Sequence, residues 1–142
     1  MREAKVITCF LLRRSGDGDE ILLLRRSQQV GTYRGRWAGV SGYIEETDPL
    51  AQAYTEMEEE AGLTREDVQL LRTGEPLEVM DAEADRRWIV HPFLFEVREP
   101  SRIRADWEHV ETRWIRPEEV FQYETVPQLA ETLMRVYPLR RP

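Results

Sequence analysis

The pattern of apolar and polar residues in the first part of the chain predicts strands joined by turns. Lys5–Leu12 and Glu20–Arg26 are apolar runs typical of strands, and Ser15–Asp19 between them has the glycine and aspartate content of a hairpin turn. Ser27–Arg36 is polar and predicts a loop. Trp37–Glu45 predicts an extended segment, because its glycines permit tight backbone geometry.

A helix is predicted to follow this segment. Asp48 suits the N-cap and Pro49 the first turn, and Gly62 after Ala61 supplies a C-terminal stop. Apolar residues recur at helical spacing and form a stripe that is expected to face the core. The stripe consists of Leu50, Tyr54, Met57 and Ala61.

The rest of the chain predicts further strands and a second helix. Four mainly apolar runs indicate strands at Val68–Leu71, Leu77–Met80, Trp88–Val97 and Thr112–Ile115. Pro117–Phe121 predicts a helical turn, and Val126–Tyr137 predicts a closing helix, because its apolar residues also recur at helical spacing. Strands combined with two separated helices indicate an α/β sandwich with a mixed sheet.

Length, composition and charge narrow the class of protein. The 142 residues fit a single domain, and the contents of 41% hydrophobic and 33% charged residues exclude a collagen-like or wholly disordered chain. No apolar stretch approaches the roughly 20 residues of a membrane span, so no membrane partner is expected. The single cysteine, Cys9, cannot form an intramolecular disulfide, which predicts a cytoplasmic protein with Cys9 in the core. The net charge of −7 argues against a nucleic-acid partner.

Acidic residues gather on one side of the first predicted helix. Glu56, Glu59 and Glu60 share one arc beside the core-facing stripe, whereas Glu58 points away from it. Like charges three and four residues apart destabilise a helix, and acids near its C-terminal end oppose its dipole. A divalent cation would offset both effects, and oxygen ligands suit Mg²⁺ or Mn²⁺. A solvated acidic face explains the same pattern, so the helix alone leaves the two interpretations open.

The residues around this helix resemble the Nudix hydrolase family, whose signature is G-x5-E-x7-R-E-U-x-E-E-x-G-U, with U a bulky aliphatic residue. Glu56–Leu63 matches the second half of the signature without a gap, and Ser41–Glu46 resembles its glycine-rich strand and turn. The resemblance implies the Nudix-type α/β/α sandwich with a mixed sheet as one domain over residues 1–142. The signature arginine is replaced by Thr55, and Thr47-Asp48 is one residue shorter than the family's Gly-Glu-Thr.

The resemblance also implies an activity. Nudix hydrolases use Mg²⁺ or Mn²⁺ and an activated water to cleave a diphosphate linkage in a nucleoside diphosphate joined to another group, or in a related small organic diphosphate. Glu56, Glu59 and Glu60 would hold the metal together with the backbone carbonyl of Ser41. The catalytic base would be Glu56 or the loop residue Glu108. The alternative is a Nudix-fold nucleotide-binding or regulatory module with weak or no turnover.

Substrate-binding candidates lie in the polar loop and the segments beside it. Arg34 or Arg36 is expected to pair with phosphate, and Tyr33 or Trp37 to stack on a base, although Trp37 is favoured as a core residue. Arg25 is a further candidate for phosphate binding, although strand alternation leaves open whether it or Arg26 faces the site. The glycine-rich turn adds Gly42, beside the predicted metal site.

Two further expectations come from the same resemblance. Asp106–His109, followed by Trp114, resembles a short motif of the dihydroneopterin triphosphate diphosphatase branch of the family, in which an acid of this loop reaches the metals. This motif is the reason for naming Glu108 as a catalytic candidate. Dimers are common among the relatives, so a homodimer is left open.

Overall fold

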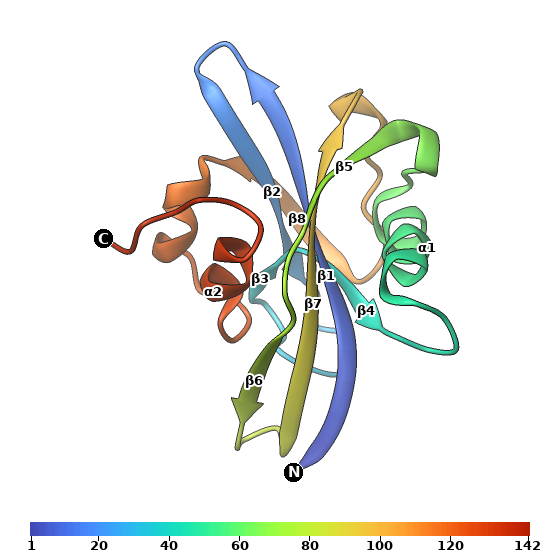
Figure 1. Cartoon of the computed structure of the whole chain (residues 1–142), viewed down its shortest axis with the longest axis vertical. Coiled ribbons are helices and arrows are strands. Elements are labelled where there is room, and N and C mark those ends of the chain that lie inside the picture. Colours follow the sequence, from blue (N-terminus) through green and yellow to red (C-terminus); the bar gives the residue numbers. More distant parts are fainter.

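A mixed sheet of eight strands forms the centre of the computed structural model, which describes all 142 residues (Figure 1). Its strands are β1 (Arg2–Ser15), β2 (Gly18–Arg26), β3 (Trp37–Ala38), β4 (Val40–Tyr43), β5 (Val68–Thr73), β6 (Leu77–Asp81), β7 (Arg86–Val97) and β8 (His109–Ile115). Strand β1 pairs antiparallel with β2 and β4 and parallel with β7. Strand β2 also pairs antiparallel with β3 and β8, as β7 does with β5 and β6. The parallel β1–β7 pair makes the sheet mixed.

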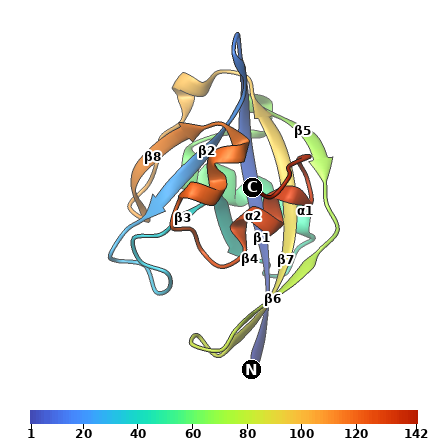
Figure 2. The same cartoon turned by 90° about the vertical axis from the view of Figure 1, so that its left-hand side faces the viewer.

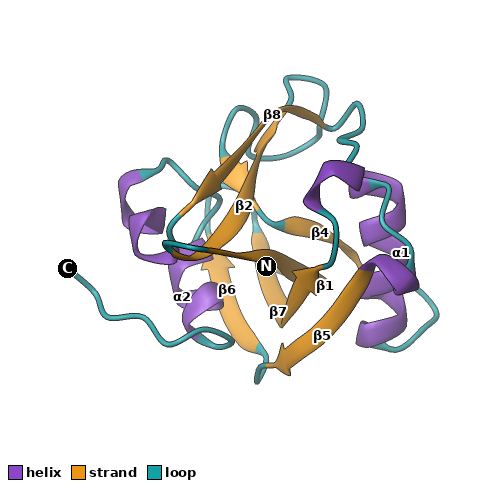
Figure 3. Cartoon of the chain, turned by 90° about the horizontal axis from the view of Figure 1, so that it is seen from above, coloured by secondary structure: helices purple, strands orange, loops and turns teal.

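Two α-helices cover opposite faces of this sheet. Figures 1 and 3 show α1 (Pro49–Ala61) on one side of the strands and α2 (Leu129–Met134) on the other. Three short 3₁₀ helices lie in the connections: η1 (Arg65–Asp67), η2 (Pro100–Arg102) and η3 (Pro117–Gln122). This arrangement confirms the predicted α/β/α sandwich. Neither α-helix has the length and apolar character that crossing a membrane requires.

Strand β1 is apolar through its middle because both faces of the sheet are covered. Ile7, Cys9 and Leu11 point into the core on the α1 side, and Phe10 and Leu12 point into the core on the α2 side. All five side chains are inaccessible to solvent or nearly so. Cys9 is therefore a core residue, as the sequence predicts.

The ends of α1 follow the predicted capping residues. The Asp48 carboxylate accepts a hydrogen bond of 2.8 Å from the backbone N–H of Ala51. Gly62 takes a left-handed conformation with φ of 69°, which ends the helix. Met57 and Ala61 are fully buried against the sheet, so the core-facing stripe is where its spacing predicts it.

Several strands extend two or three residues beyond their predicted bounds, as β1 does at both ends, and two further boundaries differ for reasons that the structure shows. The closing helix covers only Leu129–Met134, because the chain before it bonds to β3 instead: Thr125 forms a bridge with Trp37, and the Val126 N–H donates to the Trp37 carbonyl at 2.9 Å. Gln128 then has a left-handed backbone, with φ of 56°, which prevents an earlier start of the helix. Strand β8 begins at His109, three residues before the predicted start. The β1–β2 and β6–β7 hairpins project at opposite ends of the molecule, the latter beside the N-terminus (Figures 1 and 2).

Candidate active site

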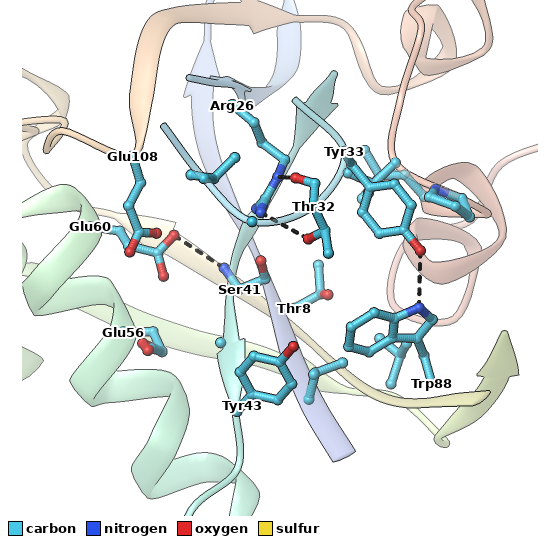
Figure 4. A pocket seen from close by; sticks show the side chains of 18 of the residues that line it. Thr8, Arg26, Thr32, Tyr33, Ser41, Tyr43, Glu56, Glu60, Trp88 and Glu108 are labelled. Carbon is cyan, nitrogen blue, oxygen red and sulfur yellow. Dashed lines mark hydrogen bonds between the residues drawn. The ribbon is translucent and has the colours of Figure 1, made fainter. Parts of the chain in front are cut away.

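A cavity of about 390 Å³ lies beside the sheet, bounded by β1, β4, β6, β7, helix α1, the loops at 26–33 and 107–108, and the segment 126–132 that includes the start of α2. Figure 4 shows two different ends. At one end, hereafter the acidic end, are the carboxyl groups of Glu56, Glu60 and Glu108. At the other, the aromatic end, are the rings of three residues: Tyr33, Tyr43 and Trp88.

The acidic end is built by α1 and by the loop before β8. Glu60 is 3% exposed, and its Oε1 accepts from the backbone N–H of Ser41 at 3.4 Å. Glu56, one helical turn earlier, has a buried Oε2 without any hydrogen-bond partner. Glu108 reaches the same end from the loop, so two distant parts of the chain supply the cluster (Figure 4).

Gly42 lies directly against the Glu56 side chain. A Cβ atom at this position would overlap the Glu56 carboxyl group. Strand β4 can pass this close to α1 only because residue 42 has no side chain. The glycine predicted in the turn is therefore the residue that leaves room for the carboxylate.

Burial and mutual repulsion raise the pKa values of all three acids. The pKa of Glu60 rises to about 9, because burial and then the charges of Glu108 and Glu56 disfavour its ionised form. The pKa of Glu56 rises to about 7, through burial and then the charge of Glu59. Burial, followed by the charge of Asp106, raises the pKa of Glu108. The cluster thus lacks sufficient positive charge and favours either protons or a bound cation.

A buried histidine, His109, lies next to Glu60. His109 Nε2 lies 3.7 Å from Glu60 Oε1, and its Nδ1 lies 3.4 Å from Asp106 Oδ1, but neither nitrogen makes a hydrogen bond of good geometry. Burial lowers the pKa of His109, which favours the neutral ring. The imidazole therefore does not supply the charge that the acids lack.

The donor set at the acidic end fits a hard divalent cation. It offers carboxylate oxygens from Glu56 and Glu60, including the unpartnered Glu56 Oε2, and no cysteine sulfur. In their present positions, however, no three Asp, Glu, His or Cys side chains are arranged to share a metal ion. The carboxylates would have to move closer together to form one coordination sphere.

The other two acids of the helix lie away from the cavity lining. Glu59 is exposed, although its charge still raises the pKa values of Glu56 and Glu108. Glu58 is exposed too, beside a second surface hollow with Thr55. The shared arc predicted from helical spacing therefore places Glu56 and Glu60 in the cavity and Glu59 at its margin.

Of the two arginines that end β2, Arg26 lines the cavity and Arg25 does not. The β2–β8 pairing shifts register between them: Arg25 lies opposite Glu111 and Arg26 opposite His109, which leaves Val110 without a partner. The Arg25 side chain donates to the Gly35 carbonyl at 3.0 Å instead. Strand alternation cannot reveal this bulge, so the sequence leaves the choice open.

Arg26 faces the acids and also fixes the adjacent loop. Its Nε donates to the Thr32 carbonyl at 2.9 Å, and its Nη2 donates to Thr32 Oγ1 at 3.3 Å (Figure 4). Burial lowers its pKa, while the charges of Glu60 and Glu108 raise it. It is the one cationic side chain that lines the cavity.

The remaining candidates from the polar loop are divided. Tyr33 lines the aromatic end, whereas Arg34 and Arg36 lie outside the lining. Arg34 Nε donates to the Val30 carbonyl at 2.8 Å, and Arg36 Nε lies 3.9 Å from Glu124 Oε1. Three further aromatic residues line the cavity. Trp88 and Trp107 are expected from the sequence as packing residues first and ligand contacts second, whereas Tyr43 was missed, because a single aromatic residue in a strand usually indicates packing.

Comparison with known proteins agrees with this architecture. The NUDIX domain model matches residues 2–136. The fold is similar to a C. elegans Ap4A hydrolase in a binary complex (20% identity, 93% of each chain covered, TM-score 0.77). It is also similar to the Nudix hydrolase RenU from M. smegmatis (20% identity, 99% of this chain and 92% of that chain, TM-score 0.76). A third similar structure is the MutT protein from Methanosarcina mazei Go1 (24% identity, 95% and 94% covered, TM-score 0.71).

No curated protein matches the chain. At these identities the three structures establish the fold alone. The domain model, in contrast, spans nearly the whole sequence and includes both the motif helix and the loop that carries Glu108. The chain therefore belongs to the Nudix family of pyrophosphohydrolases.

Proposed function

We propose that this Nudix protein hydrolyses a diphosphate linkage in a nucleoside diphosphate joined to another group, with Mg²⁺ or Mn²⁺ as its cofactor. The observation that carries the proposal is the convergence of Glu56, Glu60 and Glu108 at one end of a cavity, without enough positive charge to balance them. Such a site favours a cation, and a cation in turn favours the anionic oxygens of a diphosphate.

Each acidic residue has a proposed role. Glu56, Glu60 and the backbone carbonyl of Ser41 would hold the metal, and Glu59 at the margin would join them as an outer ligand. A bound divalent cation supplies charge neutralisation at phosphorus and lowers the pKa of a coordinated water. Glu56 and Glu108 are the two candidates for the base that takes the proton from the attacking water, because both face the cavity with raised pKa values.

Arg26 is the proposed phosphate-binding cation. Two of its N–H groups hold Thr32, and the remaining guanidinium donors are available on the side of the cavity. Arginine suits this role because its rigid fork matches two phosphate oxygens. Arg25, Arg34 and Arg36 are the proposed contacts for the part of the substrate that extends beyond the cavity.

The test is a product screen with Mg²⁺ over nucleoside triphosphates, dinucleoside polyphosphates, nucleotide sugars and ADP-ribose, with the nucleotide products separated by chromatography. Separation is needed because cleavage of a diphosphate linkage such as that of ADP-ribose yields two phosphorylated products and no free phosphate. Glu60→Gln and Glu56→Gln should each lower kcat by about a hundredfold or more on the best substrate. Glu58→Gln is the matched control, since it removes the same charge from the same helix outside the cavity. Loss of activity in the control equal to that in the other two variants would contradict the assigned site.

A nucleotide-binding or regulatory module with weak turnover is the second candidate. It is favoured by Thr55 at the position of the signature arginine and by carboxylates that do not yet share a coordination sphere. Calorimetry and the hydrolysis screen together separate the two functions. A protein that binds Mg²⁺ and nucleotides but releases no phosphate or nucleotide product from any substrate class would be such a module.

A further inference from the structure

The aromatic end of the cavity is one continuous wall made by three separate segments. Tyr33 comes from the loop after β2, Tyr43 from the end of β4 and Trp88 from β7. The ring centroids of Tyr33 and Trp88 are 6.4 Å apart, and those of Tyr43 and Trp88 are 5.9 Å apart. Both pairs are tilted, and Trp88 is the shared neighbour of the two tyrosines (Figure 4).

The surroundings of this wall are aliphatic. Trp88 packs in a small buried cluster with Val79 and Val90, and Val6 and Tyr33 lie against the same cluster. All five of these side chains line the cavity. A surface of rings and branched aliphatic groups favours a flat, weakly hydrated group over a sugar or a charged group.

The hydroxyl group of Tyr33 is occupied by protein partners. It donates to Asp81 Oδ2 at the end of β6 and accepts from Trp88 Nε1 at 3.0 Å. The other oxygen of Asp81 accepts from the backbone N–H groups of Glu83 and Ala84, at 3.1 and 3.3 Å, so the carboxylate is itself fixed. The hydrogen bond from Tyr33 lowers the pKa of Asp81, which keeps it an acceptor at neutral pH.

Asp81 therefore determines how the Tyr33 ring is presented. Tyr33 has a left-handed backbone with φ of 50°, a conformation that residues other than glycine seldom adopt. The neighbouring Thr32 is held by Arg26, which faces the acidic end. The short stretch Thr32–Tyr33 is thus hydrogen-bonded through Thr32 to Arg26, which faces the acidic end, and through Tyr33 to Asp81 in the β6–β7 hairpin.

We propose that Tyr33, Tyr43 and Trp88 form the binding wall for the aromatic base of the substrate nucleotide, with Asp81 as the residue that positions Tyr33. This inference rests on the proposed function and specifies its substrate class. The wall holds a base mainly through ring contacts, because the Tyr33 hydroxyl and the Trp88 N–H are already paired with protein groups and only the Tyr43 hydroxyl is left to bond to a base. All four common bases should therefore be accepted.

The size of the cavity adds a second statement about the substrate. Ligand pockets typically measure about 300–1,000 Å³, and this one, at about 390 Å³, is near the lower limit. It suits a single nucleotide, with its base at the aromatic end and its phosphates at the acidic end. The other group of the substrate would lie outside the cavity, where its chemistry is less restricted.

The experiment measures binding in the absence of turnover. Calorimetry with AMP, GMP, CMP and UMP in the presence of Mg²⁺ should give dissociation constants within about tenfold of one another. Ribose 5-phosphate, which lacks the base, should bind about tenfold or more weakly, as expected when ring stacking is lost. Equal affinity for AMP and ribose 5-phosphate, including no detectable binding of either, would overturn the proposal.

Variants identify the residues of the wall. Tyr43→Leu should reduce the preference for AMP over ribose 5-phosphate by about fivefold or more, and Tyr43 is 53% exposed, so the fold should tolerate the change. Met80→Ala is the matched control, because Met80 is an exposed apolar residue beside Asp81 that does not line the cavity. An unchanged preference in Tyr43→Leu would remove Tyr43 from the wall and contradict the inference.

The positioning role of Asp81 has its own test. Asp81→Asn and Tyr33→Phe should each weaken AMP binding without affecting ribose 5-phosphate. The double variant should be no worse than Tyr33→Phe alone, since Tyr33→Phe already removes the hydrogen bond to Asp81 together with the one from Trp88. In the hydrolysis assay both should raise KM and leave kcat nearly unchanged. Additive losses, or equal losses for both ligands, would indicate a merely structural role.

These outcomes separate the two proposals. If the chain binds AMP in preference to ribose 5-phosphate but hydrolyses no nucleotide, the base-binding role of the wall is supported and the proposed hydrolysis is wrong. If the chain hydrolyses a diphosphate substrate but Tyr43→Leu and Asp81→Asn leave KM and the AMP preference unchanged, the proposed hydrolysis is supported and the base-binding role of the wall is wrong.

Discussion

Gly42 and the Glu56 carboxyl group occupy adjoining space, and a Cβ atom on Gly42 would overlap the carboxyl group. Strand β4 and helix α1 thus meet at a point where one residue must lack a side chain so that the other can face the cavity. Because Glu56 has a flexible side chain, a larger residue at position 42 would displace the carboxylate more readily than the backbone.

Gly42→Ala is therefore expected to impair the site without unfolding the protein. The displaced Glu56 would lose its place among the proposed metal ligands, and kcat should fall by about tenfold or more, as changes beside metal ligands usually cause. Gly16→Ala, in the β1–β2 hairpin with open space around its Cβ, should behave as the unaltered protein. The checks are kcat over a range of Mg²⁺ concentrations and the melting temperature. Full activity of Gly42→Ala would refute the proposed role of Glu56.

Glu108 and Glu111 provide a matched pair of acids on either side of the β8 bulge. Glu108 lines the cavity, whereas Glu111 does not. Glu111 Oε2 lies 2.7 Å from Arg113 Nη2, and Glu111 Oε1 lies 3.7 Å from Arg25 Nη1. Glu108→Gln should lower kcat by about a hundredfold if this carboxylate takes the proton from water, and Glu111→Gln should leave kcat nearly unchanged. Near-normal rates in both variants would leave Glu56 as the base.

The stability of the metal-free protein should fall as the pH rises. Glu60 and Glu56 have folded-state pKa values of about 9 and about 7, above the ordinary value of 4.5. Because the folded state binds these protons more tightly than the unfolded state, their stabilising effect is complete below about pH 4.5 and is lost as the pH rises through 7 and 9. The melting temperature in a chelating buffer should therefore decline over this range.

Two comparisons test the origin of that decline. Glu60→Gln should flatten the dependence of melting temperature on pH, and the exposed Glu58→Gln should retain it. Saturating Mg²⁺ should raise the melting temperature most at high pH, where the carboxylates are ionised and bind a cation best. A decline equally steep in Glu60→Gln would assign the effect to other groups.

Thr55 occupies the position of the signature arginine, yet it is exposed and its hydroxyl donates to the Ala51 carbonyl at 3.2 Å. Thr55→Arg should change kcat by less than about tenfold, roughly 1.4 kcal/mol of barrier, because Thr55 is exposed beside the second surface hollow and does not line the cavity. A gain of several hundredfold would instead identify a degenerate enzyme and favour the nucleotide-binding module.

Local signals in the sequence predict the helix and most strands. Asp48 and Gly62 define α1 because capping is a short-range interaction, and the spacing of Glu56 and Glu60 places both on one side of the helix. The boundary errors at α2 arise where long-range pairing overrides local preference: Val126 bonds to Trp37, far away in the sequence.

The aromatic end could not be predicted in the same way. Tyr33 is a base-stacking candidate from the sequence, but its neighbours Tyr43 and Trp88 come from two other segments that only the folded sheet brings next to it. The choice of Arg26 over Arg25 depends on the unpaired Val110, which belongs to the pairing of two strands and not to either sequence alone.

The parallel pairing of β1 with β7 has a consequence for how the molecule folds. Val6 lies beside Val90, and β4 and β6, which carry Tyr43 and Asp81, attach to these two strands from either side. The cavity therefore cannot form until the chain has closed a long loop, which is slow compared with the formation of hairpins and helices. During synthesis the motif helix would leave the ribosome well before β7. Refolding from denaturant should accordingly show the amides of the β1–β2 hairpin protected from hydrogen exchange before those that join β1 to β7.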